Sequence, residues 1–204
     1  MLNEILAGAC AYVLGSIPWG LWIGHLWGGI DVREYGSKNT GATNIYRVLG
    51  MKAALLVFLL DAGKGALGVW LGMWLTGDPS GALIGGLGAI IGHNWSFIMK
   101  FKGGRGVATG VGVLAMLMPP VAAAAFICWG IAVALTRYVS LGSVLGAGIA
   151  PILAWYLGYP SSYQVVVLLA SLFVIFRHRE NIIRLFQGTE SKVGRIAADK
   201  EEPK

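Results

Sequence analysis

The sequence predicts an all-α, polytopic membrane protein of about seven transmembrane helices, and three observations lead to this prediction. First, the 204 residues are 56% hydrophobic and only 13% are charged. Second, the mean hydropathy is +0.67, which makes the chain too apolar for an ordinary soluble domain. Third, apolar stretches long enough to cross a bilayer recur along the chain between short polar connections.

Seven stretches approach the roughly 20 residues that a transmembrane helix requires. They cover residues 2–24, 53–76, 81–99, 106–118, 120–136, 139–158 and 163–176. The fourth is short and the third to sixth are rich in glycine, so their ends are the least defined. A secretory signal peptide is the alternative for the first stretch, but such peptides begin with basic residues, whereas the first charge here is Glu4.

The basic residues predict the orientation of these helices. Every Lys and Arg except Lys64 lies in alternate connections or in the tail, at residues 33–52, 100–105, 137 and from 177 onward. The positive-inside rule then places the N-terminus outside the cell and the C-terminus in the cytoplasm. The formal net charge of +6 suits anionic headgroups and anionic substrates at the inner face.

A single membrane domain, residues 1–204, is expected, with residues 192–204 as a flexible cytoplasmic tail. Nucleic acid is not an expected partner, because the basic face lies against the bilayer and no binding module is recognisable. Cys10 and Cys128 fall inside predicted spans and are interpreted as small apolar packing residues. They indicate neither a disulfide framework nor a cysteine metal site.

The connection between the third and fourth spans has the sequence KFKGGRGVATG. Gly103, Gly104 and Gly106 would let backbone N–H groups approach an anion closely. Arg105 offers a planar fork for phosphate oxygens, and Lys102 adds positive charge. The helix that follows would add the free N–H groups of its first turn. A phosphate-binding loop and a flexible basic anchor at the bilayer edge both remain open on these residue types.

The connection after the first span, GSKNTGATNIYRVLG, is dense in hydroxyl and amide groups. Thr43, Asn44 and Arg47 would share one helix face, and such a face can hold a second phosphate beside a polyol. The alternative is an interfacial helix capped by Ser37 or Thr40. That alternative accounts for one hydroxyl but not for this many, so the binding interpretation is favoured.

The stretch FRHRENIIRLFQGTE after the last span holds the best-placed titratable group. His178 and Asn181 lie one turn apart, and Glu180 and Arg184 have the spacing of an i,i+4 ion pair. His178 could accept a proton or orient a hydroxyl near neutral pH, although a lone histidine near a span end is more often interfacial. His93, within the third span, could support the site.

Asp61 and Lys64 lie one turn apart inside the second span. A charge at the bilayer centre costs roughly 2.5–3.5 kcal/mol on insertion scales, so such residues face protein and usually pair. An internal ion pair that fixes helix packing or orients the cytoplasmic loops is favoured over part of a substrate pathway. No cofactor is expected, because the inner face lacks the paired carboxylates that hold Mg²⁺.

Five motifs in this order resemble those of the bacterial acyl-phosphate:glycerol-3-phosphate acyltransferases. They are GSIP, GSKNTGATN, DAGKG, FKGGRGVAT and HRENIIRLFQGTE, and they span nearly the whole chain. The resemblance implies a seven-span membrane enzyme that makes lysophosphatidic acid. It also implies acyl phosphate as the donor, in place of acyl-CoA or acyl carrier protein. Like that family, the sequence lacks the His-x4-Asp motif of the soluble-type acyltransferases.

The resemblance implies residue roles by position. Ser37 and Arg47 match residues needed for activity, the GGRG loop matches the phosphate-binding loop, and His178 and Asn181 match residues that contact glycerol 3-phosphate. The expected catalytic set is Ser37, Arg47, His178 and Asn181, and the expected substrate-binding set is Thr43, Asn44, Lys102, Gly103, Gly104, Arg105 and Gly106.

This sequence departs from the family pattern at two positions. Arg105 stands where lysine is more common, and Lys38 stands where a glycine usually follows the serine. Arginine keeps the charge and the affinity for phosphate, so activity is expected to be retained. Lys38 adds a cation near the donor site and leaves the geometry of that loop open.

The predicted reaction is direct acyl transfer to the sn-1 hydroxyl of glycerol 3-phosphate. His178 or an oxygen of the substrate would act as the base, and an acyl-serine at Ser37 is not required. The expected partners are acyl phosphate, glycerol 3-phosphate and membrane lipids. The protein is expected to act as a monomer in the bacterial cytoplasmic membrane, with its site facing the cytoplasm.

Two other classes of protein are alternatives to an enzyme. An organic-phosphate transporter would share the basic face and the Asp61–Lys64 pair, but transporter sites lie near the midplane and often between repeats. A membrane scaffold with a lipid-binding basic face would not need the convergent Ser, Asn, Thr and His groups. An acyltransferase is therefore preferred.

Overall fold

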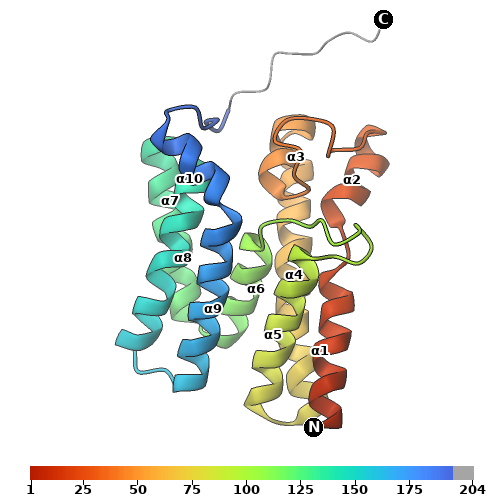
Figure 1. Ribbon diagram of the computed structural model, residues 1–204, viewed down its shortest axis with the longest axis vertical. Helices are drawn as coiled ribbons and strands as arrows, with labels where there is room; N and C mark the ends of the chain where they lie inside the picture. The colour runs from red at the N-terminus through yellow and green to blue at the C-terminus, as the bar shows by residue number, and fades with distance from the viewer. Residues whose placement is uncertain (195–204) are drawn as a thin grey trace, which may run out of the picture.

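The computed structural model describes residues 1–194, within which the chain forms ten α-helices and no β-strand (Figure 1). The all-α prediction is confirmed. The helices are α1 (Leu2–Gly15), α2 (Trp19–Gly28), α3 (Ala42–Leu49), α4 (Met51–Thr76), α5 (Pro79–Asn94), α6 (Val107–Leu117), α7 (Pro119–Thr136), α8 (Val139–Tyr156), α9 (Ser161–Arg177) and α10 (Arg179–Phe186).

Among residues 1–194, four stretches are long and apolar enough to cross a bilayer. They are Leu2–Gly28, Met51–Thr76, Pro119–Thr136 and Val139–Tyr156. The pair α9 and α10, which is bent by 56°, would make a fifth if it were one span. The protein is therefore a polytopic membrane protein with four to five candidate spans. The predicted total of seven is not reached by length and composition, because α5 has 16 residues and α6 only 11.

The first predicted span is broken into α1 and α2. The chain leaves the helix at Ser16 and resumes at Trp19. Pro18 explains the break, because proline has no N–H to donate and it disfavours helical geometry in the residue before it. The break lies beside the C-terminal end of α5 and the start of the loop that follows it, where Ser96 Oγ donates a hydrogen bond to Ser16 O at 2.6 Å.

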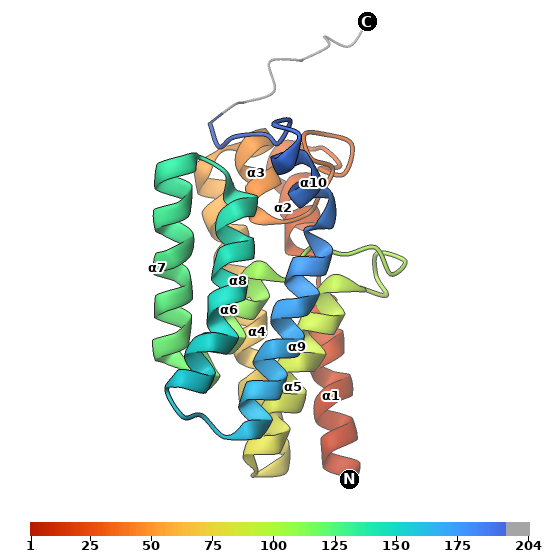
Figure 2. The same ribbon diagram turned by 60° about the vertical axis from the view of Figure 1, so that its left-hand side comes forward.

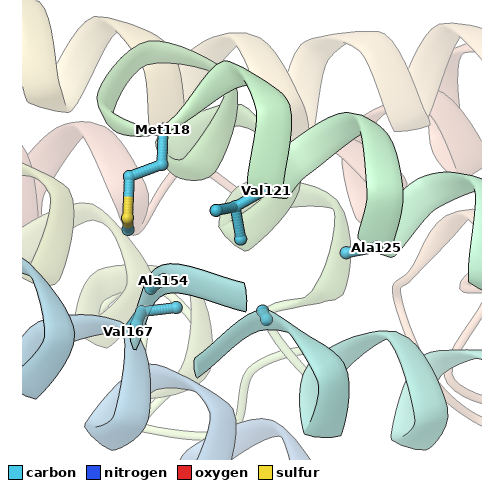
Figure 3. Close-up of a cluster of buried hydrophobic side chains, with 6 residues drawn as sticks. Met118, Val121, Ala125, Ala154 and Val167 are labelled. Carbon is cyan, nitrogen blue, oxygen red and sulfur yellow. The ribbon is translucent and has the colours of Figure 1, made fainter. Parts of the chain in front are cut away.

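The helices form two packed groups (Figures 1 and 2). In one group α4 and α5 approach closely through glycines one turn apart on each helix. A Cβ on Gly68 or Gly72 would overlap the backbone of Gly85 or Gly81, so larger residues would force these helices apart. In the other group α7, α8 and α9 share an apolar core (Figure 3). That core consists of Met118, Val121, Ala125, Ala150, Ala154 and Val167.

Different elements lie at the two ends of the bundle. The N-terminus and the turn between α8 and α9 lie at one end, and α3 and α10 lie at the other (Figures 1 and 2). The loop from α5 to α6 lies between these levels, because α5 ends at Asn94 rather than at the predicted residue 99. The glycine-rich loop therefore lies nearer the middle of the bundle than α3 and α10 do.

The predicted tail begins within the described part of the chain. Val193 N–H donates to Arg137 O at 2.7 Å, and Lys192 Nζ lies over the ring of Tyr138. The rest of the predicted tail, residues 195–204, lies outside the described residues.

Candidate active site

Three polar segments distant in sequence meet in the half of the bundle that carries α3 and α10, and the glycine-rich loop lies below those two helices (Figure 2). Hydrogen bonds across more than 70 positions join them. Arg47 Nη2, on α3, donates to Ser191 O at 3.1 Å. Arg177, at the end of α9, donates to the carbonyl oxygens of Gly103 and Gly104 at 2.8 Å. The segments singled out by the sequence therefore line one region.

The segment before α3 is organised by Asn44, whose side chain is buried. Asn44 Oδ1 accepts the backbone N–H of Ser37 at 2.7 Å. Its Nδ2 donates to the carbonyl oxygens of Val32 at 2.9 Å and Tyr35 at 3.1 Å. The amide that the sequence assigned to substrate binding is thus engaged with the backbone, where it holds Ser37 in place. Thr43 is half-buried, and Ser37 itself is exposed.

Lys38, in the same segment, has a φ of 55°. This left-handed conformation strains any residue with a Cβ and suits glycine. The resemblance implies a glycine at this position, and the backbone geometry supplies a physical reason for it. The replacement by lysine therefore places conformational strain beside Ser37.

The glycine-rich loop packs tightly on the end of α5. Gly104 N–H donates to His93 O at 3.1 Å. A Cβ on Gly103 would overlap that same carbonyl oxygen, and a Cβ on Gly104 would overlap the imidazole of His93. The glycines are thus required by close packing, and the N–H of Gly104 is already used within the protein. Lys102 is exposed at the start of the loop.

The start of α6 is lined by buried polar groups that sequence reasoning missed. Gly106 caps the helix with a φ of 79°, and a Cβ there would lie 2.9 Å from Asn94 Oδ1. Asn94 and Thr109 are both fully buried. Both amide atoms of Asn94 and the Thr109 hydroxyl lack a hydrogen-bond partner within residues 1–194. The sequence pointed to Asn94 as a site residue only through its position directly after His93.

His178 lies at the bend between α9 and α10 and is 2% exposed. Its Nδ1 is 2.8 Å from Val174 O. A carbonyl oxygen can only accept, so this contact assigns the proton to Nδ1 and leaves Nε2 as the basic nitrogen. The imidazole is therefore oriented by its own helix and presents a lone pair on its other side.

Asn181 and Arg184, both on α10, hold the carboxylate of Glu190. Asn181 Nδ2 donates to Glu190 Oε1 at 2.7 Å, and Arg184 Nε donates to Glu190 Oε2 at 2.7 Å. Asn181 Oδ1 is buried and has no hydrogen-bond partner in the described chain. Sequence reasoning gave Glu190 no role, because its partners depend on how the chain turns after α10.

The predicted Glu180–Arg184 ion pair is wrong. Arg184 pairs with Glu190, and Glu180 lies 3.8 Å from Arg179. The reason is the left-handed turn at Gly188, whose φ is 70°. It folds the chain back so that Glu190 N–H approaches Arg184 O at 3.2 Å, and the returning carboxylate takes the guanidinium.

The electrostatics of the region are those of an anion site. Burial lowers the pKa of Arg105 and of Arg47, and the charge of Glu190 partly offsets this effect for both. Burial alone would raise the pKa of Glu190, but hydrogen bonds, above all from Asn181, place it below its ordinary value. Glu190 is therefore ionised at neutral pH among several guanidinium groups. The surplus positive charge, together with Arg47 Nε that is buried without a partner among the described residues, suits anionic ligands.

No group of three or more His, Cys, Asp or Glu side chains within residues 1–194 is arranged to hold a metal ion. The charged groups of the site are instead guanidinium groups around one carboxylate. Such a set can bind and position phosphate groups through forked hydrogen bonds.

Comparison with known proteins adds to this geometry. The family model for glycerol-3-phosphate acyltransferase matches residues 5–188. The glycerol-3-phosphate acyltransferase of Synechococcus sp. (strain JA-3-3Ab) is 49% identical over 193 residues, which cover 95% of each chain. That of Gloeobacter violaceus (strain ATCC 29082 / PCC 7421) is 42% identical, over 93% of this chain and 95% of its own.

Two crystal structures are also similar over most of their length. Both are of PlsY (YgiH), an integral membrane glycerol 3-phosphate acyltransferase, at 38% identity. The glycerol 3-phosphate form has a TM-score of 0.89 and covers 94% of this chain and 96% of that chain. The lysophosphatidic acid form has a TM-score of 0.85 and covers 93% of this chain and 94% of that chain.

Proposed function

The chain belongs to the glycerol-3-phosphate acyltransferase family, and on that premise we propose that acyl phosphate is its acyl donor. The protein is a membrane enzyme that acylates glycerol 3-phosphate and makes lysophosphatidic acid. The observation that carries the proposal is the convergence of three polar segments on one cationic site. A 38% identical structure in glycerol 3-phosphate and lysophosphatidic acid forms supports the acceptor and the product.

The proposed reaction is a direct displacement. The sn-1 hydroxyl oxygen of glycerol 3-phosphate attacks the acyl carbonyl carbon, the bond from that carbon to the phosphate oxygen breaks, and inorganic phosphate leaves. The hydroxyl proton passes to His178 Nε2 or to an oxygen of the phosphorylated substrate. An acyl phosphate is already an activated anhydride, so the enzyme chiefly positions the substrates and neutralises charge.

The side chains of the site have different roles in the proposed reaction. Arg105 and Arg47 provide charge for the two phosphates, and exposed Lys102 adds to the field. Ser37, held at its backbone by Asn44, contributes an exposed hydroxyl. Two groups suit the glycerol hydroxyls: His178 Nε2, which carries a lone pair because the Val174 contact places the proton on Nδ1, and Asn181 Oδ1, which has no hydrogen-bond partner within residues 1–194.

We also propose how the helices cross the membrane. We place seven helical segments in the bilayer, with the N-terminus outside and the site facing the cytoplasm, and we expect a monomer. Two features support this arrangement: the basic connections alternate along the chain, and α3 and α10 lie at the end opposite the N-terminus. In this arrangement α5 and α6 are the two short segments, joined by the glycine-rich loop within the membrane region.

The donor assignment has a direct test. Purified enzyme is given glycerol 3-phosphate and palmitoyl phosphate without added metal, and phosphate and lysophosphatidic acid are measured. Both products are expected in equal amounts. A parallel reaction with palmitoyl-CoA, which would release the CoA thiol in place of phosphate, is expected to give no lysophosphatidic acid. Activity with palmitoyl-CoA alone would reject acyl phosphate as the donor while leaving the acceptor assignment intact.

A further inference from the structure

We propose that Asp61, Lys64 and His93 form a buried positioning cluster that fixes the two phosphate-binding segments relative to each other. The inference rests on the proposed function, because it takes the segment around Ser37 and the glycine-rich loop as those two segments. It assigns to the cluster a role in the rate of acyl transfer, apart from any contact with substrate.

The three side chains of the cluster lie close together and are buried. Lys64 Nζ lies 2.9 Å from Asp61 Oδ1, and His93 Nδ1 lies 3.6 Å from the same oxygen. The exposed fractions of Asp61, Lys64 and His93 are 2%, 3% and 7%. Charges buried inside a membrane bundle are costly, and replacing such a pair by apolar residues often leaves a protein no less stable. A role in stability alone is therefore a weak explanation for this pair.

A substrate pathway does not fit the space around these residues. The adjoining cavity has a volume of about 10 Å³ and is lined by the cluster, the α1–α2 break and Thr40. That is about the space of one water molecule, and it is far too small for an organic phosphate. The cluster acts through the protein rather than on a bound substrate.

One connection runs from Lys64 to the first segment. Lys64 Nζ donates to Ile17 O at 2.8 Å, within the break between α1 and α2. The break sets the direction of α2, and α2 packs through Gly20 on the backbone of Thr40, where a Cβ would overlap the carbonyl oxygen. Thr40 belongs to the segment that carries Ser37. Lys64 thus fixes the position of α2, and the segment that carries Ser37 packs on α2.

The other connection runs from His93 to the glycine-rich loop. The carbonyl of His93 accepts the N–H of Gly104, and its imidazole lies directly against Gly104. The ring also faces Asp61 Oδ1 on α4. A single carboxylate therefore faces both groups, the ammonium that supports one segment and the imidazole that supports the other.

This arrangement predicts an effect on turnover more than on binding. Each segment keeps its own phosphate-binding groups when the cluster is altered, so each substrate still binds. The distance between the attacking hydroxyl and the acyl carbonyl changes, however, and a misplacement of about 1 Å can cost on the order of 100-fold in rate. The signature is a fall in kcat with little change in KM.

The test uses the double substitution Asp61→Asn with Lys64→Met in the full-length enzyme. The double variant leaves no unpaired buried charge and removes the hydrogen bond to Ile17 O. We expect kcat to fall by roughly 10- to 100-fold, KM for glycerol 3-phosphate to stay within about threefold, and the unfolding temperature to stay near that of the wild type. Lys52→Met, the same substitution at an exposed position of α4, is the matched control and should change kcat by less than about twofold.

A folded double variant with wild-type kcat would overturn the inference, and so would a rate loss that only follows the loss of folded protein. If the double variant does not fold, His93→Ala supplies the same comparison, because it removes the ring from beneath Gly104 without removing a permanent charge. An inactive wild-type enzyme would instead reject the proposed function, so the two failures are distinguishable.

Discussion

Arg105 is the side chain for which the proposed phosphate site makes the most direct prediction. It lies in the glycine-rich loop and shares the field of Glu190 with Arg47. Hydrogen bonds to charged groups contribute about 1.5–3 kcal/mol, so Arg105→Ala should raise KM for a phosphorylated substrate by roughly 10- to 100-fold or abolish turnover. Steady-state kinetics with each substrate varied in turn measures the effect.

Arg105→Lys should keep most of the rate, because the charge remains and only the fork is lost. Arg179→Ala is the control, since Arg179 is exposed and lies over the ring of Phe176. An Arg105→Ala enzyme with unchanged kinetics would remove this residue from the site.

Lys38, which stands where the resemblance implies a glycine, has a left-handed backbone conformation. A non-glycine residue in the left-handed region costs about 1–3 kcal/mol of strain. Lys38→Gly should therefore raise the unfolding temperature by a few degrees, as about 1 kcal/mol does in a chain of this size. Lys38→Ala removes the charge but keeps the strain, and it should leave the unfolding temperature unchanged. Equal effects of the two substitutions would mean that the charge, not the conformation, is responsible.

At the scale of helices and loops, the sequence predicted long apolar elements better than their interruptions. The predicted spans 53–76, 120–136 and 139–158 agree closely with α4, α7 and α8. The break at Pro18 and the early end of α5 were missed, because hydrophobicity continues across both while helical hydrogen bonding does not. A hydropathy pattern reports burial in lipid, and it carries little information about where backbone hydrogen bonding stops.

The candidate site was predictable in its residue types but not in its partners. Asn44 and Asn181 were expected at substrate, yet Asn44 holds the backbone of Ser37 and one end of Asn181 holds Glu190. Arg177 and Glu190 were given no role. The hydrogen bonds of Arg177 depend on how two segments distant in sequence pack, and those of Glu190 depend on the turn at Gly188. Residue spacing along the chain predicts neither.

The packing of the glycine-rich loop against His93 can be tested by substitution at Gly104. A Cβ on Gly104 would overlap the His93 ring, so Gly104→Ala should lower the rate by about 100-fold or more through displacement of the loop. Adding His93→Ala removes the obstacle and should recover at least about tenfold of that loss. The rates of wild type, both single variants and the double variant measure the coupling.

Gly103→Ala is the matched control for this coupling. Its Cβ would overlap the main-chain oxygen of His93, which no substitution at position 93 removes. His93→Ala should therefore not rescue Gly103→Ala. Rescue of both variants, or of neither, would contradict a specific contact between the His93 ring and Gly104.

At the scale of the whole molecule, charge and architecture point to the same orientation. The basic connections alternate along the chain, and the segments around α3 and α10 lie at the end opposite the N-terminus (Figure 2). The turn between α8 and α9 lies at the N-terminal end and carries no Lys or Arg. The membrane surface potential favours basic segments on the cytoplasmic side, so the two ends should be separated by the bilayer.

Thiol labelling in spheroplasts tests this orientation. In a background with Cys10 and Cys128 replaced by alanine, Ser161→Cys and Thr189→Cys place single exposed thiols at the two ends. A membrane-impermeant maleimide should label Ser161→Cys in intact spheroplasts, and it should label Thr189→Cys only after permeabilisation. The reversed pattern would put the cationic site outside the cell and contradict the positive-inside assignment. Labelling of both thiols in intact spheroplasts would contradict an odd number of crossings between them and leave α9 and α10 on the outer side.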